Sequence, residues 1–386
     1  MKRWPTKLLG ELCDVEGGNA APQGAENFKD GTIPFVRMKD LGRYHFTNNL
    51  CETSDKLNEE SVATNRMKSF EPGCILFPRS GSVALNHRAI LGIHACIVSH
   101  IGVLQNLQPE MSPGFLYIYL TTFDMTALSK KTTGVDSIAF ADVKKIPVPV
   151  PPLAEQEHIV KLLNGADELR KLRVQADRRA TALIPALFHE MFGDPLANWR
   201  GWQTKELRQL GRVVTGSTPP SAKEGMFGGD IPFITPGDLE SNTHETMRYV
   251  TEAGAGEVRS IRAASTMVCC IGATIGKTDR TWKVSAFNQQ INAVEWGDEI
   301  DDDFGVVCMK QCAKVVIQQG SQTALPILKK SLFEKIRIPV PPLPLQKEFA
   351  QRVTEIRELE AGQATSRTRL DALFQSMLHR AFNGEL

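Results

Sequence analysis

Short apolar runs alternate with Gly, Pro, Asn and Asp in two long stretches of the chain, residues 1–150 and 199–340. Runs such as CILFP (74–78) between turn-forming residues are typical of β-strands. Helical spacing is found near the end of each stretch, in YIYLTTFDMTALSKK (117–131) and FGVVCMKQCAKVVIQQ (304–319). The pattern therefore predicts an α+β fold for both stretches.

A long helical pattern follows each stretch. The strings VPVPPL and IPVPPL come first and exclude helix, because proline fixes φ and disfavours helical backbone in the residue before it. In segment 151–198, apolar residues then recur at alternating steps of three and four, as in a coiled-coil seam, and only Arg173 is polar. The apolar members of this seam are Ile159, Leu162, Ala166, Leu169, Ala176, Ala180, Leu183 and Leu187. Segment 341–386 carries a second stripe: Phe349, Val353, Ile356, Leu359, Leu370, Leu373, Phe374 and Met377.

Neither helix can bury its stripe alone, so we expect the two to pack together as long antiparallel, coiled-coil-like spacers between the α+β domains. Pro185 is expected to kink or end the first helix. The regular part would then be residues 153–184, or ~48 Å at ~1.5 Å per residue. A rod of this length suits two binding modules on half-sites ~34 to 36 Å apart, or somewhat more.

The chain is also a tandem duplication. At an offset of 198 residues, WPTKLLGELCDVEGG (4–18) matches WQTKELRQLGRVVTG (202–216), and IPF at 33–35 matches IPF at 231–233. The proline strings match at an offset of 190, and Gln156 falls on Gln346 in that alignment. Segments between these matches diverge, as expected for binding loops on a retained frame. The predicted parts are two domains, 1–150 and 199–340, each followed by a helix, 151–198 and 341–386.

Composition narrows the class of protein. Lys and Arg number 45 against 44 acidic residues, so a strong overall affinity for phosphates is not expected. The chain has no stretch of ~18 apolar residues and no signal-peptide pattern, which predicts a cytoplasmic protein. Eight cysteines without a C-x-x-C pair favour buried thiols over a zinc site, and we expect no metal site and no cofactor.

Motifs for catalysis are weak. The string STPPS lacks the amide or acid that would precede the prolines in an adenine methyltransferase motif. Gly272, Gly276, Lys277 and Thr278 match the phosphate-binding loop with one residue too few. We therefore expect a non-catalytic binding protein. The alternative is a stand-alone DNA-modifying or DNA-cleaving enzyme with an unrecognised active site.

Four repeated features resemble the specificity subunit of type I restriction-modification enzymes: the W-x-T-K-x-L-x-x-L opening, the turn GSTP before IPFITPGDL, the P-P-L-x-x-Q junctions and the helix end ALFHEMFGDP. The resemblance covers the whole chain, twice. It implies that 1–150 and 199–340 are target recognition domains, each reading one half of a bipartite site in double-stranded DNA. It also implies that the helices dock two modification (methyltransferase) subunits and, through the complex, restriction (translocase/nuclease) subunits. The first copy has GNAAP in place of GSTPP, so hydroxyl contacts expected of that turn are missing there.

Candidate DNA-binding residues lie in the divergent segments and carry side chains that suit base edges. Arg and Lys suit guanine, whereas Asn and Gln suit adenine. For any one of them, a solvated surface position or a phosphate contact is the alternative. The candidates in the first copy are Arg37, Lys39, Arg43, Tyr44, Arg79, Ser80, Asn86, His87 and Arg88. Those in the second copy are Ser217, Thr218, Thr235, Lys277, Thr278, Arg280, Lys283, Asn288, Gln289 and Gln290.

Overall fold

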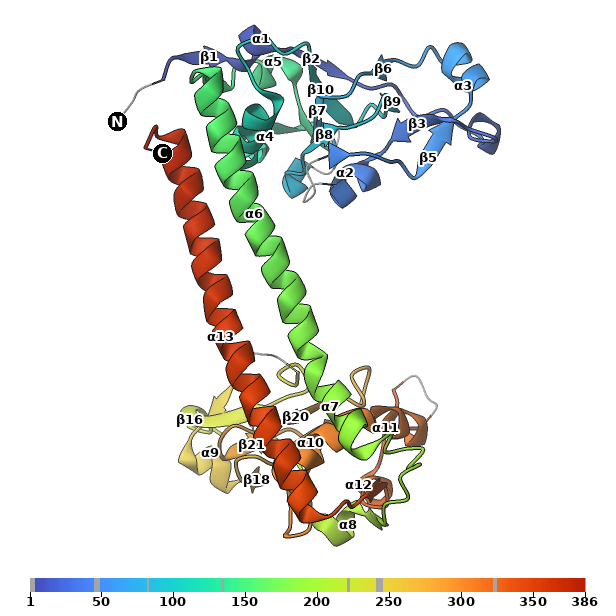
Figure 1. Cartoon of the computed structure of the whole chain (residues 1–386). Coiled ribbons are helices and arrows are strands. Elements are labelled where there is room, and N and C mark those ends of the chain that lie inside the picture. Colours follow the sequence, from blue (N-terminus) through green and yellow to red (C-terminus); the bar gives the residue numbers. More distant parts are fainter. Residues whose placement is uncertain are drawn as a thin grey trace. The chain divides into compact units, whose positions relative to one another are not determined.

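The computed structural model describes residues 4–44, 49–81, 83–132, 135–220, 223–240, 246–321 and 325–385 (Figure 1). The chain forms two compact units. The first is Met1–Lys171 with Thr368–Leu386, and the second is Leu172–Arg367. Both units mix strands with helices, which confirms the predicted α+β class.

Two sheets build the strand-rich part of the first unit. One has the order β2-β10-β7-β8-β4, in which only β4 and β8 are parallel, and the other has the order β5-β3-β9-β6, in which only β3 and β9 are parallel. The strands of the first sheet are β2 (Asp14–Gly17), β10 (Ile101–Gln105), β7 (Ile75–Pro78), β8 (Ala89–Leu91) and β4 (Asn49–Leu50). The strands of the second are β5 (Asp55–Leu57), β3 (Ile33–Val36), β9 (Ala95–Ile97) and β6 (Ser69–Phe70). The α-helices are α1 (Leu9–Leu12), α2 (Met38–Tyr44), α3 (Glu59–Thr64), α4 (Pro113–Thr122) and α5 (Phe140–Val143).

The second unit has the same strand orders, except that its described residues contain no strand equivalent to β4. Its sheets have the orders β15-β22-β19-β20 and β17-β16-β21-β18, and β16 and β21 are the parallel pair. The first sheet contains β15 (Gly211–Thr215), β22 (Ile291–Trp296), β19 (Thr266–Cys269) and β20 (Thr278–Arg280). The second contains β17 (Tyr249–Val250), β16 (Phe227–Ile234), β21 (Ser285–Phe287) and β18 (Ser260–Ile261). The α-helices are α7 (Leu183–Phe192), α8 (Leu207–Leu210), α9 (Glu252–Gly256), α10 (Asp302–Gln311), α11 (Ala313–Gln319) and α12 (Lys330–Phe333).

A short strand pair closes each domain. In the first domain, the closing pair is β1 (Thr6–Leu8) with β13 (Pro147–Pro149). A separate hairpin is formed by β11 (Ser129–Thr132) and β12 (Val135–Ile138). In the second domain, β14 (Thr204–Glu206) pairs with β23 (Arg337–Pro339). The proline strings that were predicted to exclude helix therefore begin in the last strand of each domain, and the long helices start at their final residues, Leu153 and Leu343.

Two long helices follow these last strands, α6 (Leu153–Thr181) and α13 (Leu343–Phe382). The start of α6 is buried in the core of the first unit through Ile159 and Leu163. The start of α13 is buried in the second unit, where Phe349 packs on Phe188 and Phe192 of α7. Each helix is thus anchored to the domain that precedes it in the chain.

The predicted interruption near Pro185 is present, although it comes earlier than expected. Helix α6 ends at Thr181 and α7 begins at Leu183. A proline ring clashes with the carbonyl group four residues before it, which here belongs to Thr181. Pro185 therefore ends the regular helix at that residue.

The buried stripe on α6 drifts away from the predicted seam. Leu163 is buried where the seam predicts Leu162, and Leu169 is more than half exposed. Arg170 is partly buried instead, 2.7 Å from Asp371 of α13 and with its guanidinium over the ring of Phe374. A helix with 3.6 residues per turn drifts by ~20° per heptad against a repeat of 3.5. The prediction of a strict heptad seam is therefore wrong at these positions.

The helix predicted from YIYLTTFDMTALSKK is shorter than expected. Helix α4 stops at Thr122, and Ser129–Thr132 is a strand. Phe123 is extended, and the carboxylate of Asp124 accepts hydrogen bonds from the N–H and hydroxyl groups of Thr126. Such local side-chain bonds compete with helical backbone pairing.

Among the described residues, no helix is long and apolar enough to cross a membrane. The same residues contain no group of three or more His, Cys, Asp and Glu side chains arranged to hold a metal ion. Seven of the eight cysteines are buried free thiols, and Cys51 is exposed. Burial raises the pKa of Cys13 and of Cys270 to about 12.

A pair of glycine substitutions tests the packing of the second unit. A Cβ atom on Gly216 would lie 2.1 Å from the carbonyl oxygen of Asn288, whereas one on Gly362 of α13 would meet nothing within 4 Å. We expect Gly216→Ala to lower the free energy of unfolding by ~1–3 kcal/mol, because the clash is with backbone. Gly362→Ala should raise it by up to ~1 kcal/mol. Urea unfolding of both variants measures this, and a tolerated Gly216→Ala would contradict the close approach.

Candidate nucleic-acid interface

The carboxyl ends of the parallel strands bring distant residues together in each domain. In the first, Val36 of β3 pairs with Ile97 of β9, so Arg37 and Val98 emerge at the same edge. In the second, Ile234 of β16 pairs with Phe287 of β21, so Thr235 and Asn288 emerge together. The hydrogen bonds Val98 N–H to Val36 O (3.1 Å) and Asn288 N–H to Ile234 O (3.0 Å) extend the pairing.

A third segment joins each edge through a glycine. The N–H groups of Asn19 and Ser217 each donate a hydrogen bond of 2.9 Å, to Ile97 O and Phe287 O respectively. The preceding residues are Gly18 and Gly216, and a Cβ atom on Gly18 would lie 1.9 Å from Ile97 O. Only glycine permits so close an approach, which accounts for its presence in both copies.

Cluster 2 is the group of polar residues at this edge in the second domain: Ser217, Thr218, Thr235, Asn288, Gln289 and Gln290. The Thr218 hydroxyl donates to Gln289 Oε1 at 2.8 Å. The Asn288 amide donates to Gln290 Oε1 at 2.9 Å, and its own oxygen accepts the Gln290 N–H. The structure thus brings together six residues that the sequence singled out.

Cluster 1 is the equivalent group in the first domain: Asn19, Arg37, Ser80, Ser99 and His100. Ser80 Oγ and His100 Nδ1 are 2.7 Å apart, and Ser99 N–H donates to Asn19 O at 2.7 Å. The sequence analysis missed Asn19, Ser99 and His100 as candidates. The offset of 190 that aligns the proline strings also places Ser99 on Gln289 and His100 on Gln290, and this signal could have found them.

The GNAAP and GSTPP turns differ in one functional contact. Asn19 Oδ1 accepts the N–H of Lys68, and Ser217 Oγ accepts the N–H of Arg259, so these two side chains hold equivalent backbone segments. Thr218, which reaches Gln289, corresponds to Ala20 in the first copy. The Asn19 amide therefore replaces the Ser217 hydroxyl, and the contact that the first copy lacks is the one at position 20.

A buried aspartate fixes the residue after each IPF strand. Asp40 accepts bonds from Arg37 N–H, Ser54 N–H and the Ser54 hydroxyl at 2.7–3.0 Å. Asp238 accepts bonds from the N–H and hydroxyl groups of Thr235 at 2.7 and 2.6 Å. The backbone at residues 37 and 235 is thereby held in place in both domains.

Three candidate side chains with positive charge, at or next to α2, form ion pairs with acidic residues. Arg37 and Lys39 both contact Asp55, and Arg43 contacts Glu52. Tyr44 ends α2 beside Arg43, whose guanidinium lies over the tyrosine ring. The Arg43–Glu52 pair is exposed and contributes ~0–1 kcal/mol, so a phosphate oxygen can replace Glu52 at little cost.

The remaining candidates of the first copy differ in exposure. Arg79 lies over the ring of Phe140 at 4.5 Å. Burial and the neighbouring Arg88 lower the pKa of the half-buried His87. Arg88 is completely buried, donates to Asn86 Oδ1 and to His87 O, and has its pKa lowered by burial to about 10. Its buried side chain holds the turn at 86–87 and is not available for contact with DNA. Arg88 is therefore left out of the DNA-reading set.

Four candidates of the second copy lie outside cluster 2. Lys277, Thr278 and Arg280 lie on the β19–β20 hairpin, where Thr278 is completely buried and Arg280 pairs with Asp303 of α10 at 2.7 Å. Lys283 donates to Asp230 O at 3.1 Å, before the start of β21. Thr278 is also left out of the DNA-reading set, because its hydroxyl bonds Gly276 O inside the domain.

Both clusters expose hydroxyl and amide groups, and cluster 1 adds an imidazole and a guanidinium. Such groups suit hydrogen bonding to base edges and to phosphates. The chain thus contains two related domains, each with a polar cluster of common design at the end of a parallel strand pair.

Comparisons with known proteins agree with this class. The family model for the "type I restriction modification DNA specificity domain" matches residues 1–175 and 200–365. The HindI specificity subunit of Haemophilus influenzae is 31% identical over 194 residues, which cover 48% of this chain and 42% of that subunit. The MjaIX specificity subunit of Methanocaldococcus jannaschii is 22% identical over 100% of this chain and 94% of that subunit.

A solved structure has a similar fold. A chain from a structure on the assembly and conformational transition of a type I R-M system gives a TM-score of 0.67 at 19% identity and covers 100% of this chain and 99% of that one. The chain therefore belongs to the family of type I restriction-modification DNA specificity subunits, and it contains the specificity domain twice. This membership confirms DNA recognition over the alternative of a stand-alone enzyme.

Removal of the buried aspartate tests how the first edge is held. Asp40→Ala leaves the N–H groups of Arg37 and Ser54 without an acceptor, and we expect it to lower the free energy of unfolding by ~2–4 kcal/mol. Ser54→Ala removes only the hydroxyl bond and should cost ~1 kcal/mol. Denaturant unfolding of both variants measures the difference. Equal losses would mean that Asp40 does not hold the edge.

Proposed function

We propose that the chain is the sequence-recognition subunit of a type I restriction-modification system and that each α+β domain reads one half of a bipartite DNA site. The observation that carries this proposal is the pair of clusters. Clusters 1 and 2 occupy equivalent strand ends on equivalent backbone, yet they differ in side chains, for example His100 against Gln290. A common frame with different polar groups is suited to two different half-site sequences.

Base reading is proposed for the outward residues of both clusters, with Lys39, Arg43, Tyr44, Arg79, Asn86, His87, Lys277, Arg280 and Lys283 as flanking DNA contacts. Arginine and histidine in cluster 1 suit guanine or phosphate, whereas the amides of cluster 2 suit adenine. Because the net charge is only +1, either the basic groups gather on the DNA-binding face or other subunits supply part of the affinity for DNA, and we propose the latter. A protein in this role acts where the DNA is, in the cytoplasm of a bacterial or archaeal cell.

The proposed domains are 1–150 and 199–340, with 151–198 and 341–386 as antiparallel spacer helices between them. Contacts inside each unit support the pairing of the helices. Arg170 of α6 contacts Asp371 of α13 in the first unit, and Asp177 contacts Arg367 in the second. Arg367 lies between Leu359 and Leu370, where the second stripe has no apolar member, so an ion pair takes the place of an apolar contact there.

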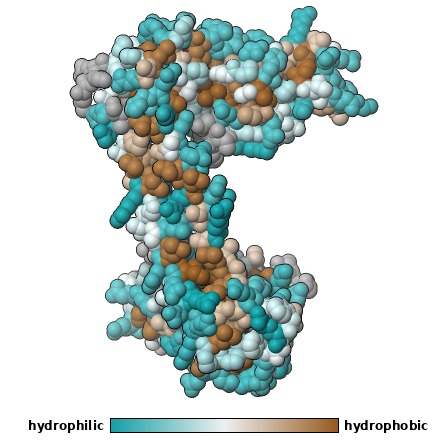
Figure 2. Space-filling view, in the orientation of Figure 1, coloured by the Kyte–Doolittle hydropathy of each residue, from teal (hydrophilic) through white to brown (hydrophobic). Residues whose placement is uncertain are grey.

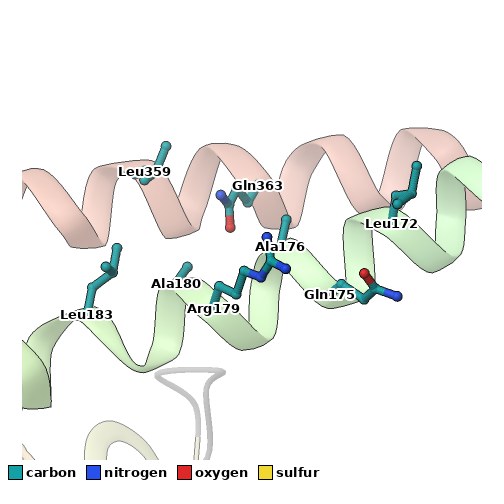
Figure 3. Close-up of a pocket in the computed structure, with 8 residues that line it drawn as sticks. All are labelled: Leu172, Gln175, Ala176, Arg179, Ala180, Leu183, Leu359 and Gln363. Carbon is teal, nitrogen blue, oxygen red and sulfur yellow. The ribbon is translucent and has the colours of Figure 1, made fainter.

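The helices also offer a surface for the modification subunits. In the second unit, a groove of about 280 Å³ is lined by Leu172, Gln175, Ala176, Arg179, Ala180, Leu183, Leu359 and Gln363. Arg179 and Gln363 point toward each other across it (Figure 3), and hydrophobic surface covers the helices next to the strand-rich body of this unit (Figure 2). Leu172, Leu183 and Leu359 are each exposed by more than two fifths. An apolar helix of a modification subunit would cover them, and restriction subunits would join through that complex.

Exchange of one domain tests the proposal. Replacing residues 1–150 with the same region of a relative should change one half of the methylated sequence and leave the other half unchanged, because the strand-end clusters are built separately in each domain. Sequencing of modified bases in a host that also carries the modification subunit reads both halves. The reciprocal exchange of 199–340 is the control. A change in both halves from either exchange would contradict independent reading.

The duplication of the helices and junctions predicts the composition of the complex. Since each of the two P-P-L-x-x-Q junctions is followed by an apolar stripe, two modification subunits should bind one copy of this chain. Native mass measurement of the assembled methyltransferase checks the stoichiometry. Leu359→Glu should weaken assembly, while Glu358→Gln on an exposed neighbouring position should not. A single modification subunit at saturation would refute the prediction.

A further inference from the structure

Each of the two junctions between domain and helix contains a buried glutamine that bonds to three backbone groups, and these groups lie at equivalent positions in the two copies. Gln156 Oε1 accepts the Ser112 N–H at 2.8 Å, and its Nε2 donates to Glu110 O at 2.7 Å and to Pro151 O at 2.8 Å. All of these partners are backbone groups. The two protons on Nε2 each donate to a carbonyl oxygen, and the amide oxygen accepts an N–H, so the orientation of the amide group is fixed.

Gln346 makes the same contacts in the second copy. Its Oε1 accepts the Asp301 N–H at 2.9 Å, and its Nε2 donates to Glu299 O at 3.0 Å and to Pro341 O at 2.8 Å. Both glutamines are completely buried. Large polar side chains are seldom buried in a core unless their hydrogen bonds are satisfied. The presence of the same buried, fully bonded glutamine in both copies therefore indicates a specific structural role.

The partners explain what the glutamine connects. It lies in the first turn of the long helix, whereas Ser112 and Asp301 are the residues that precede the first turns of α4 and α10. One amide therefore joins the start of the long helix, the proline junction and a helix inside the domain. A single hydrogen bond would allow rotation about it, but bonds to three backbone positions do not.

Apolar contacts continue from the glutamine along one face. Ile159 and Leu163 follow Gln156 at steps of three and seven residues, and Phe349 and Val353 follow Gln346 at the same steps. All four side chains are buried in the core of their own unit. Residues at these steps share a helix face, so glutamine and apolar pair form one continuous anchor.

We propose that Gln156 and Gln346 are positioning residues that fix the direction in which each long helix leaves its recognition domain, and that they thereby determine how strictly the protein selects the gap between the two half-sites. This inference rests on the proposed function. Neither glutamine faces DNA, because both are buried beneath the junction. Their loss should therefore relax the gap and leave the bases of both half-sites unchanged.

The test uses the full chain assembled with its modification subunits. Methylation is measured on duplexes that carry both half-sites with gaps from two base pairs shorter to two longer than the natural one. Gln156→Met keeps the length and apolar packing of the side chain but removes all three bonds. We expect methylation at the neighbouring gap lengths to rise about tenfold relative to the natural gap, which is the lower end of the effect that three lost hydrogen bonds produce.

Leu91→Ala is the matched control, because Leu91 is buried in a core cluster of the same unit that contains no residue of α6. It should lower the melting temperature without changing the gap profile. Gln346→Met repeats the test in the other unit and decides the matter if Gln156→Met does not fold. A gap profile of either folded variant that matches the wild type would overturn the inference alone. A wild-type complex that methylates no bipartite site would overturn the proposed function, and the inference with it.

Discussion

Parallel pairing of two short strands is the interaction on which the recognition surface depends. β3 and β9, like β16 and β21, come from parts of the chain separated by more than fifty residues, and only their pairing places residue 37 beside 98 and residue 235 beside 288. The segment that follows Gly18, or Gly216 in the second domain, then forms backbone hydrogen bonds with the same strand end. Because all three segments are held through backbone groups, the side chains at the edge are free to differ between the copies.

The junctions with the long helices also depend on contacts to backbone groups. Gln156 and Gln346 bond only to backbone atoms, so their contacts survive changes in neighbouring side chains. The two domains have diverged in strand lengths and loops, as the difference between β3 and β16 illustrates. Both domains retain two kinds of contact. One is the hydrogen bond between backbone groups of distant segments, and the other is the hydrogen bond from a backbone group to a buried polar side chain such as Asp40 or Asp238.

Helix α6 illustrates a limit of pattern analysis. The alternating steps at Ile159 and Leu162 correctly predict a long helix after the proline junction, but the buried face moves to Leu163 and Arg170. Apolar residues on both sides of the true stripe make a 3.5-residue and a 3.6-residue repeat hard to distinguish over a few turns. Which side of the helix is buried is settled by packing on the domain core and on α13, and the latter lies 200 residues away in the sequence.

The sequence by itself determined the duplication, the α+β class and the proline junctions with their helices, because these depend on local spacing and on internal repeats. The family was indicated by the resemblance of the repeated motifs to those of known specificity subunits. The sequence also placed all the residues of cluster 2 among the candidates. Only the tertiary structure decided which candidates are buried, namely Arg88 and Thr278, and that Ser99 and His100, which were not candidates, belong to cluster 1. The physical reason is that exposure at the end of a parallel strand depends on its distant partner, and neither residue type nor local periodicity records that partner.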